Sequence, residues 1–182
     1  MESLAFYHRP ALPNVPADPR AAIAYIKALP PEQREGIAIA YVPLAAVRKD
    51  VAALCTATET HRLTLPPANW GTIKVGAGAP PVRIDEGWLS VIHGVDELQH
   101  STDGSLLRYC AGVIIHDPRR LERITFRSAE PLFVPQVGAE LRGAVGHVVF
   151  PTGIDRRGDR EFDIYYGMAD DEIGRGRLSL DA

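Results

Sequence analysis

The stretch IDEGWLSVIHG, residues 84–94, decides the fold class of this 182-residue chain. It predicts a strand, an acidic turn that closes on Gly87, and a second apolar strand that ends in His-Gly, which together form a β-hairpin. The stretch IDRRGDREFDIYYG, residues 154–167, repeats this arrangement with a longer turn, and SLAFYHRP, residues 3–10, resembles the second half of a third copy. Recurring hairpins predict the blades of a β-propeller, and the alternative is a β-sandwich in which the hairpins recur by coincidence.

If the copies are blades, WLSVIHG and FDIYYG are equivalent strands of neighbouring, four-stranded antiparallel sheets. Strands are predicted at residues 4–8, 36–42, 72–75, 82–84, 88–95, 106–115, 123–127, 145–150, 161–166 and 173–180. Apolar residues recur at helical spacing in residues 20–29 and 44–54, which predicts two short helices. We therefore expect an all-β fold, a partial β-propeller with two short helices, in a single domain over residues 1–182.

The composition is typical of a soluble globular protein, with 46% hydrophobic and 24% charged residues. A net charge of -3 argues against a nucleic-acid surface, and no apolar run approaches the roughly 20 residues of a membrane helix. The two cysteines, Cys55 and Cys110, form no CxxC motif, and the six histidines show neither HxH nor HExxH spacing. We therefore expect a cytoplasmic protein with no metal site, no nucleic-acid partner and no membrane association.

Three basic residues flank strands in corresponding parts of the three copies: Arg9, Lys74 and His93. His93 ends a strand face that is otherwise apolar, shared with Leu89 and Val91 because side chains alternate along a strand. Each residue also has an ordinary structural role open to it, His93 as a half-buried ring bonded to a carbonyl and Lys74 as a solvated loop lysine. If the copies are blades, the three side chains converge near the propeller axis and suit a phosphate or another oxyanion.

Longer stretches of the chain resemble the second half of glycoside hydrolase family 130. They are KVGAGAPPVRIDEGWLSVIHGV, YCAGVIIHDPRRLERITFRSAEPLFVP and VVFPTGIDRRGDREFDIYYGMADDEIGRGRLSL, and HRP at residues 8–10 matches an earlier motif of the family. The family contains mannoside phosphorylases and related mannosidases on a five-bladed propeller. The resemblance implies that this chain supplies about three of the five blades, while residues 13–69 match weakly and form an insert-rich segment.

The resemblance also implies an activity, the cleavage of β-mannosides by inorganic phosphate to give α-mannose 1-phosphate. The residues at the family's phosphate positions are Arg9, Lys74, His93 and Tyr109. Asp170, in GMAD, falls on a sugar contact. The implied partners are a mannoside oligosaccharide or small glycoside and inorganic phosphate as co-substrate, and no cofactor is implied.

The chain departs from the family at several positions. The family's general-acid aspartate lies upstream of Met1 and has no counterpart here, so we expect the chain to be incomplete or inactive alone. Tyr41 stands where many members carry a polar or basic residue, and Gly146-His147 replaces a usual Pro-Asn. The alternatives are a non-catalytic sugar- or phosphate-binding module, a gene fragment, or a hydrolytic glycosidase. Open sheet edges also predict a homo-oligomer or a partner chain that supplies the missing blades.

Overall fold

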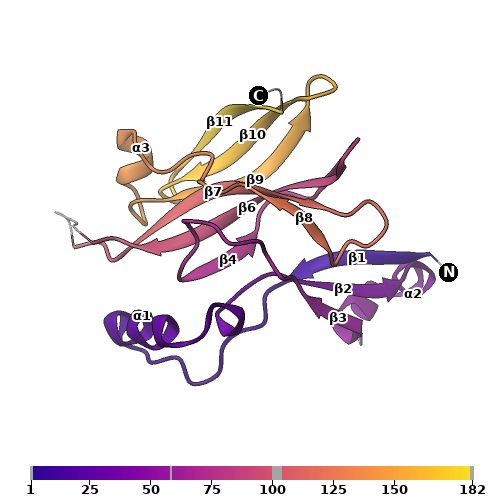
Figure 1. The fold of residues 1–182 in the computed structure, drawn as a ribbon, viewed down its shortest axis with the longest axis horizontal. Coiled ribbons are helices and arrows are strands. Elements are labelled where there is room, and N and C mark those ends of the chain that lie inside the picture. The colour runs from indigo at the N-terminus through magenta and orange to yellow at the C-terminus, as the bar shows by residue number, and fades with distance from the viewer. Residues whose placement is uncertain (1, 58, 100–103, 181–182) are drawn as a thin grey trace.

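The computed structural model describes residues 2–57, 59–99 and 104–180, and its strands form three antiparallel sheets (Figure 1). The first sheet has the order β1 (Ser3–His8), β2 (Ala38–Pro43) and β3 (Glu59–Arg62). The central sheet contains β4 (Lys74–Ala77), β5 (Val82–Ile84), β6 (Gly87–Glu97), β7 (Leu107–His116) and β8 (Ile124–Arg127). The C-terminal sheet has the order β11 (Glu172–Ser179), β10 (Glu161–Met168) and β9 (Val149–Arg156).

The central sheet is a four-stranded meander whose first strand is interrupted. Both β4 and β5 pair with β6, β4 at residues 92–95 and β5 at residues 87–89. The gap between them holds Pro80 and Pro81, which lack the backbone N–H that a continuous ladder needs. The expectation of four-stranded blades therefore holds for this sheet, whereas the first and the C-terminal sheets have three strands each in the described part of the chain.

The three sheets stack face to face, as neighbouring blades of a propeller do. Two clusters of buried side chains join them. One cluster fills the space between the first and central sheets and includes Ile39, Trp70 and Ile114. The other lies between the central and C-terminal sheets and includes Leu89 and Phe162. The hairpin strands WLSVIHG and FDIYYG thus lie in different, neighbouring sheets, and the predicted all-β partial propeller is confirmed.

Two predicted helices have different outcomes. The helix predicted at residues 20–29 is α1 (Pro19–Ala28), which Asp18 caps by accepting a hydrogen bond from the Ala21 N–H at 2.8 Å. The single helix predicted at residues 44–54 is wrong. It is split into α2 (Leu44–Lys49) and a 3₁₀ helix (Val51–Thr56), because Asp50 is extended and its carboxylate accepts from the Ala52 N–H to start the second piece.

The strand predicted at residues 145–150 is also misplaced. The observed strand is β9, which begins at Val149 and continues to Arg156 because its pairing with β10 extends that far. The short helix α3 (Gly138–Leu141) and the 3₁₀ turn Pro31–Gln33 were not predicted. Strand β3 was not predicted either, since its sequence ETHR is exposed and polar and only its pairing with β2 makes it a strand.

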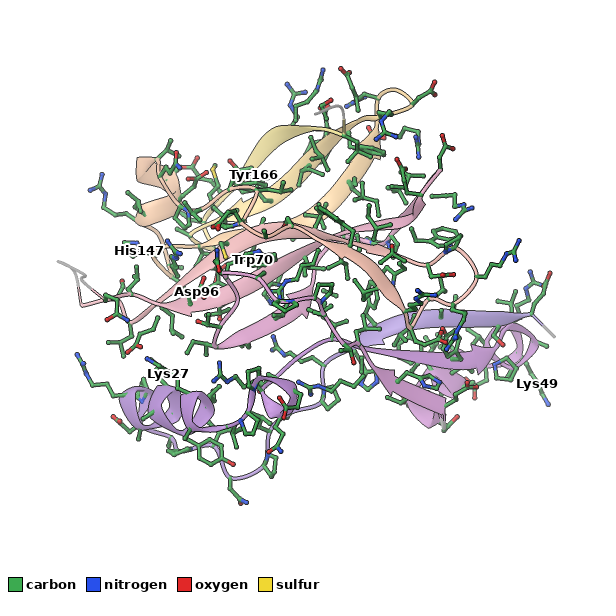
Figure 2. All side chains as sticks on the ribbon, in the orientation of Figure 1. Lys27, Lys49, Trp70, Asp96, His147 and Tyr166 are labelled. Atoms are coloured by element: carbon green, nitrogen blue, oxygen red, sulfur yellow. The ribbon has the colours of Figure 1, made fainter. Side chains whose placement is uncertain are left out.

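Trp70 is the side chain around which the face of the central sheet toward the first sheet is packed (Figure 2). It is 1% exposed, and its indole N–H donates to the Ser128 carbonyl at 2.8 Å. The Arg127 guanidinium lies 4.6 Å from its ring centroid. The ring itself lies directly against the backbone of Gly94 and Gly112, where side chains of any other residue would collide with it. These two glycines therefore make room for Trp70 on β6 and β7.

Helix α1 covers one end of the central sheet, where Ile23 and Ile26 pack against Ile73 and Val95 (Figure 1). Because α1 has 10 residues, it is far shorter than a bilayer-spanning helix. Within the described ranges, no helix combines the length and the apolar character that crossing a membrane would require.

Replacing Gly112 with alanine tests the packing of Trp70. The new Cβ would lie 2.2 Å from Trp70 Cζ2, so the ring or the strands must move, and we expect the free energy of unfolding in urea to fall by about 1–3 kcal/mol. Gly176→Ala, on β11, is the matched control, because no heavy atom lies within 4 Å of the Cβ that it adds. Equal losses of stability in the two variants would contradict this account of the core.

Candidate functional site

His93 lies near the end of β6 and is 3% exposed. Its Nδ1 is 3.0 Å from the Ala77 carbonyl oxygen, so Nδ1 carries the proton and donates. Its Nε2 is buried and has no hydrogen-bond partner among the described residues. The ring thus makes the predicted hydrogen bond to a carbonyl on one side and has an unpaired nitrogen on the other.

Gly76 provides the space for this ring. It pairs with His93 across β4 and β6, and a Cβ at Gly76 would lie 2.4 Å from His93 Nε2 and 3.3 Å from Arg9 Nη1. The unpaired nitrogen and the guanidinium of Arg9 therefore lie close to the same glycine. A residue with a side chain at position 76 would displace both of them.

The two cations beside His93 act on its protonation. Burial, followed by the charges of Arg9 and Lys74, lowers the pKa of His93 to about 4, although the Ala77 hydrogen bond acts in the opposite direction. The imidazole is therefore neutral at pH 7, and Nε2 presents a lone pair that accepts a hydrogen bond.

Tyr109 completes the group through the register of the central sheet. Lys74 on β4 and Tyr109 on β7 both pair with Val95 on β6, so their side chains lie on one face of the central sheet. His93 is two residues before Val95 on β6 and therefore shares that face. Lys74 Nζ is 5.6 Å from the centroid of the Tyr109 ring, and the ring centroids of His93 and Tyr109 are 6.1 Å apart. The structure thus brings together Arg9, Lys74, His93 and Tyr109, which we name the basic cluster.

Two residues of the cluster's surroundings were missed by sequence reasoning. Phe150, from β9, lies over His93 with ring centroids 4.3 Å apart. Glu35 Oε2 is 3.5 Å from Arg9 Nε, and among the described residues it is the carboxylate that pairs with the cluster. Phe150 stands in the quoted VVFP motif and was available as a signal, whereas nothing in the sequence marks Glu35 as a partner of Arg9.

The remaining candidate from the sequence is Asp170. It is exposed in the turn between β10 and β11, with a left-handed φ of 54°, and none of the described contacts joins it to the basic cluster. The preceding residue, Ala169, donates its N–H to the Val148 carbonyl at 3.1 Å, which fixes the turn beside the start of β9. Its assignment as a sugar contact stays a prediction.

The two departures from the family pattern have different positions. Tyr41 lies on β2, where its hydroxyl is 3.3 Å from Glu122, and burial raises its pKa to about 12. His147 precedes β9 (Figure 2), has a φ of 61°, and its carbonyl accepts the Tyr109 N–H at 2.9 Å. The Gly146-His147 segment therefore positions the backbone of Tyr109, although its sequence is unusual for the family.

Two cavities lie near the basic cluster without enclosing it. One, of about 490 Å³, is lined by Ala77, Gly78 and Trp88 among others. The other, of about 510 Å³, is lined by Lys74 and Glu35 among others. Neither of these two cavities is lined by all four cluster residues, and a single cavity shared by the four stays a prediction. Cys55 and Cys110 are both free thiols, and the described residues contain no group of three or more His, Cys, Asp or Glu side chains arranged to hold a metal ion.

Comparison with known proteins identifies close sequence relatives. The chain is 35% identical over 124 residues to a beta-1,4-mannooligosaccharide phosphorylase of Ruminococcus albus, covering 66% of this chain and 35% of that protein. It is 33% identical over 105 residues to a beta-1,2-mannobiose phosphorylase of Thermoanaerobacter, covering 58% of this chain and 32% of that protein. The chain thus spans about a third of the length of the curated relatives that it matches.

A solved structure shows the same fold. The beta-1,2-mannobiose phosphorylase of Listeria innocua, in complex with beta-1,2-mannobiose, aligns with a TM-score of 0.69 at 23% identity over 98% of this chain and 41% of that chain. The family model described as beta-1,4-mannooligosaccharide phosphorylase matches residues 56–182, which is more than half of the chain. On the strength of that match, together with the shared motifs and fold, this chain belongs to glycoside hydrolase family 130.

Proposed function

We propose that this chain provides the phosphate side of a mannoside phosphorylase site. In this proposal the basic cluster holds inorganic phosphate while it attacks the anomeric carbon of a β-mannoside, and the product is α-mannose 1-phosphate. The observation that carries the proposal is the buried, unpaired Nε2 of His93 between two cations. The relatives' names include both β-1,2 and β-1,4 mannosides, so the proposal assigns the substrate class without a linkage.

The charges of the cluster favour an anion. Lys74 has no carboxylate partner among the described residues, and Arg9 has Glu35 at 3.5 Å. The charges of Arg9 and Lys74 repel each other beside the buried ring, and a bound anion relieves that repulsion. At neutral pH, hydrogen phosphate offers charged oxygens to Arg9 and Lys74 and one hydroxyl that can donate to the neutral His93 Nε2.

This set of contacts suits phosphate as a nucleophile. The new bond joins a phosphate oxygen to the anomeric carbon, the glycosidic carbon–oxygen bond breaks, and the departing oxygen takes a proton from a general acid. Fixed cations hold the attacking oxygen in position beside the positive charge that develops on the sugar ring. Hydrolysis uses water in place of phosphate and has no need of such cations, which favours the phosphorylase over the glycosidase alternative.

The described carboxylates offer no suitable acid at the cluster. Glu35 is held in an ion pair with Arg9, and Asp170 is exposed in a turn. We therefore propose that the proton comes from a carboxylic acid that these 182 residues do not supply. This absence favours the second candidate, a phosphate- or sugar-binding module without catalysis, for the chain in isolation.

Phosphate binding can be measured directly by isothermal titration calorimetry at pH 7. Lys74→Met removes a charge-assisted contact, and His93→Phe removes the acceptor at Nε2, so we expect each to weaken phosphate binding about tenfold or more. Lys49→Met is the matched control, because Lys49 lies at the end of α2, away from the central sheet (Figure 2). Unchanged affinity in Lys74→Met, or the same loss in Lys49→Met, would remove the proposed phosphate site.

The pKa of His93 makes a second prediction. Its folded-state pKa of about 4 lies below the ordinary value of 6.5, so between these pH values the unfolded chain binds a proton that the folded chain does not. Stability therefore falls as the pH is lowered from 6.5 to 4. His93→Gln should remove about 1–3 kcal/mol of this pH-dependent change in unfolding free energy relative to the unmodified chain.

The imidazole can also be followed by NMR. Saturating phosphate should raise the pKa of His93, since an adjacent anion favours the charged ring. A His93 that titrates near 6.5 in the free protein would contradict the burial and the charge arrangement described above.

Catalysis by the chain alone is the third test. We expect the purified 182-residue chain to release little or no mannose 1-phosphate from β-mannosides and phosphate, because loss of a general acid costs roughly 10²–10⁴-fold in rate. Adding a polypeptide that contains the other blades should restore turnover. Fast turnover by the chain alone that Asp170→Asn abolishes would show instead that Asp170 is the acid.

A further inference from the structure

A cavity of about 510 Å³ opens beside the basic cluster, between the first sheet and the central sheet. Its walls come from residues 31–37, from residues 62–72 and from Arg127 at the end of β8, and we name it the arginine cavity. The residues that bring charge to it are Arg34, Arg62, Arg127, Lys74, Glu32 and Glu35. The wall at residues 31–37 lies outside residues 56–182, the segment that matches the family model.

The arginines of the cavity are held by backbone carbonyls. Arg34 donates to the carbonyls of Leu29, Thr72 and Lys27 at 3.0, 2.6 and 3.1 Å. This network fixes the guanidinium between α1 and the start of β4. Since carbonyl oxygens carry no net charge, the positive charge of Arg34 is positioned but not neutralised.

Arg127 and Arg62 follow the same pattern. Arg127 donates to the carbonyls of Pro66 and Trp70 at 3.1 and 2.8 Å, and its Nε is buried without a partner among the described residues. Arg62 donates to the Arg34 carbonyl, and its other donors are not engaged by the described residues. Across the described part of the chain, none of these arginines forms an ion pair with a carboxylate. The cavity therefore has a fixed excess of positive charge.

The two carboxylates on the same walls narrow the chemistry of the ligand. Glu35 pairs with Arg9, and Glu32 has no ion pair with the described residues. A small anion with negative charge on every side would be attracted by the arginines but repelled by these two carboxylates. A ligand with one anionic group and several hydroxyls satisfies both, because hydroxyls donate to carboxylates while the anion accepts from guanidinium groups. The apolar parts of the wall, which include Ile37, Leu63 and Leu65, suit the C–H face of a sugar ring.

We propose that the arginine cavity binds a phosphorylated sugar at a second site, which shares only Lys74 with the basic cluster. Arg62 is the direct ligand of the phosphate group, because its guanidinium is the least engaged of the three. Arg34 and Arg127 supply fixed positive charge, and Glu32 accepts hydrogen bonds from sugar hydroxyls. The volume lies within the roughly 300–1,000 Å³ of small-molecule sites. The proposal rests on the contacts of this cavity and stands independently of the proposed phosphorolysis.

The two tryptophans allow a local measurement. Trp70 lines the arginine cavity, whereas Trp88 lines the other cavity, so their indole N–H signals in a ¹⁵N NMR spectrum report on the two places separately. Trp88→Phe assigns the two signals. We expect the Trp70 signal to shift on titration with mannose 1-phosphate at a lower concentration than with mannose or inorganic phosphate alone.

Matched variants separate this site from the basic cluster. Arg62→Gln should weaken the mannose 1-phosphate titration of Trp70 about tenfold, while Arg48→Gln, an exposed arginine on α2, should leave it unchanged. His93→Phe should also leave the Trp70 titration unchanged, even where it abolishes phosphate binding at the cluster. Loss of phosphate binding at the basic cluster would count against the proposed phosphorylase function, whereas loss of the Trp70 response would count against the sugar-phosphate site.

A second variant keeps the proposal falsifiable if Arg62→Gln disturbs the fold. Glu32 is exposed, and Glu32→Gln should lower the preference for mannose 1-phosphate over inorganic phosphate at Trp70. The proposal is overturned if Trp70 does not respond, if Arg48→Gln weakens the response as much as Arg62→Gln, or if His93→Phe abolishes it. Equal affinity for inorganic phosphate and mannose 1-phosphate would also overturn it.

Discussion

The ladder between β6 and β7 is the interaction on which the rest of the structure depends. It pairs Trp88 with His116 at one end and Glu97 with Leu107 at the other in one uninterrupted antiparallel register. Each face of this ladder carries a separate core, one shared with the first sheet and one with the C-terminal sheet. Because side chains alternate along a strand, a slip of one residue would exchange the two faces and remove both cores.

The same ladder builds the basic cluster. It sets His93 and Tyr109 on one face, and the pairing of β4 with β6 adds Lys74 and the open space at Gly76. His93 is buried under Phe150, and its Nε2 has no hydrogen-bond partner among the described residues, which costs stability in the absence of a ligand. An arrangement that costs stability in the folded protein is characteristic of functional sites, where a bound ligand offsets the cost.

The arginine cavity follows a different principle. There the guanidinium groups are held by backbone carbonyls from the loops around α1 and residues 63–72, and the strand ladder plays a smaller part. Lys74 borders both the cavity and the basic cluster, so the two share a wall of positive charge. The chain as a whole has a net charge of -3, so this positive charge is local and is invisible in the overall composition.

The sequence by itself determined the features that depend on local pattern. Hairpins such as residues 84–94 could be predicted because alternation and turn residues act over a few positions, and that alternation correctly placed His93 on the face with Leu89 and Val91. The convergence of Lys74, His93 and Tyr109 also followed from the sequence, through the repeated strands and the resemblance to the family.

Tertiary structure alone decided the features that depend on distant partners. Strand β3 exists because β2 offers it hydrogen bonds, and Glu35 neutralises part of Arg9 because the loop before β2 lies beside the end of β1. Likewise, Trp70 is central because Gly94 and Gly112, far along the chain, leave room for its ring. Such contacts cannot be predicted from local propensity or periodicity, because they stabilise the protein only once residues separated by tens of positions are brought together.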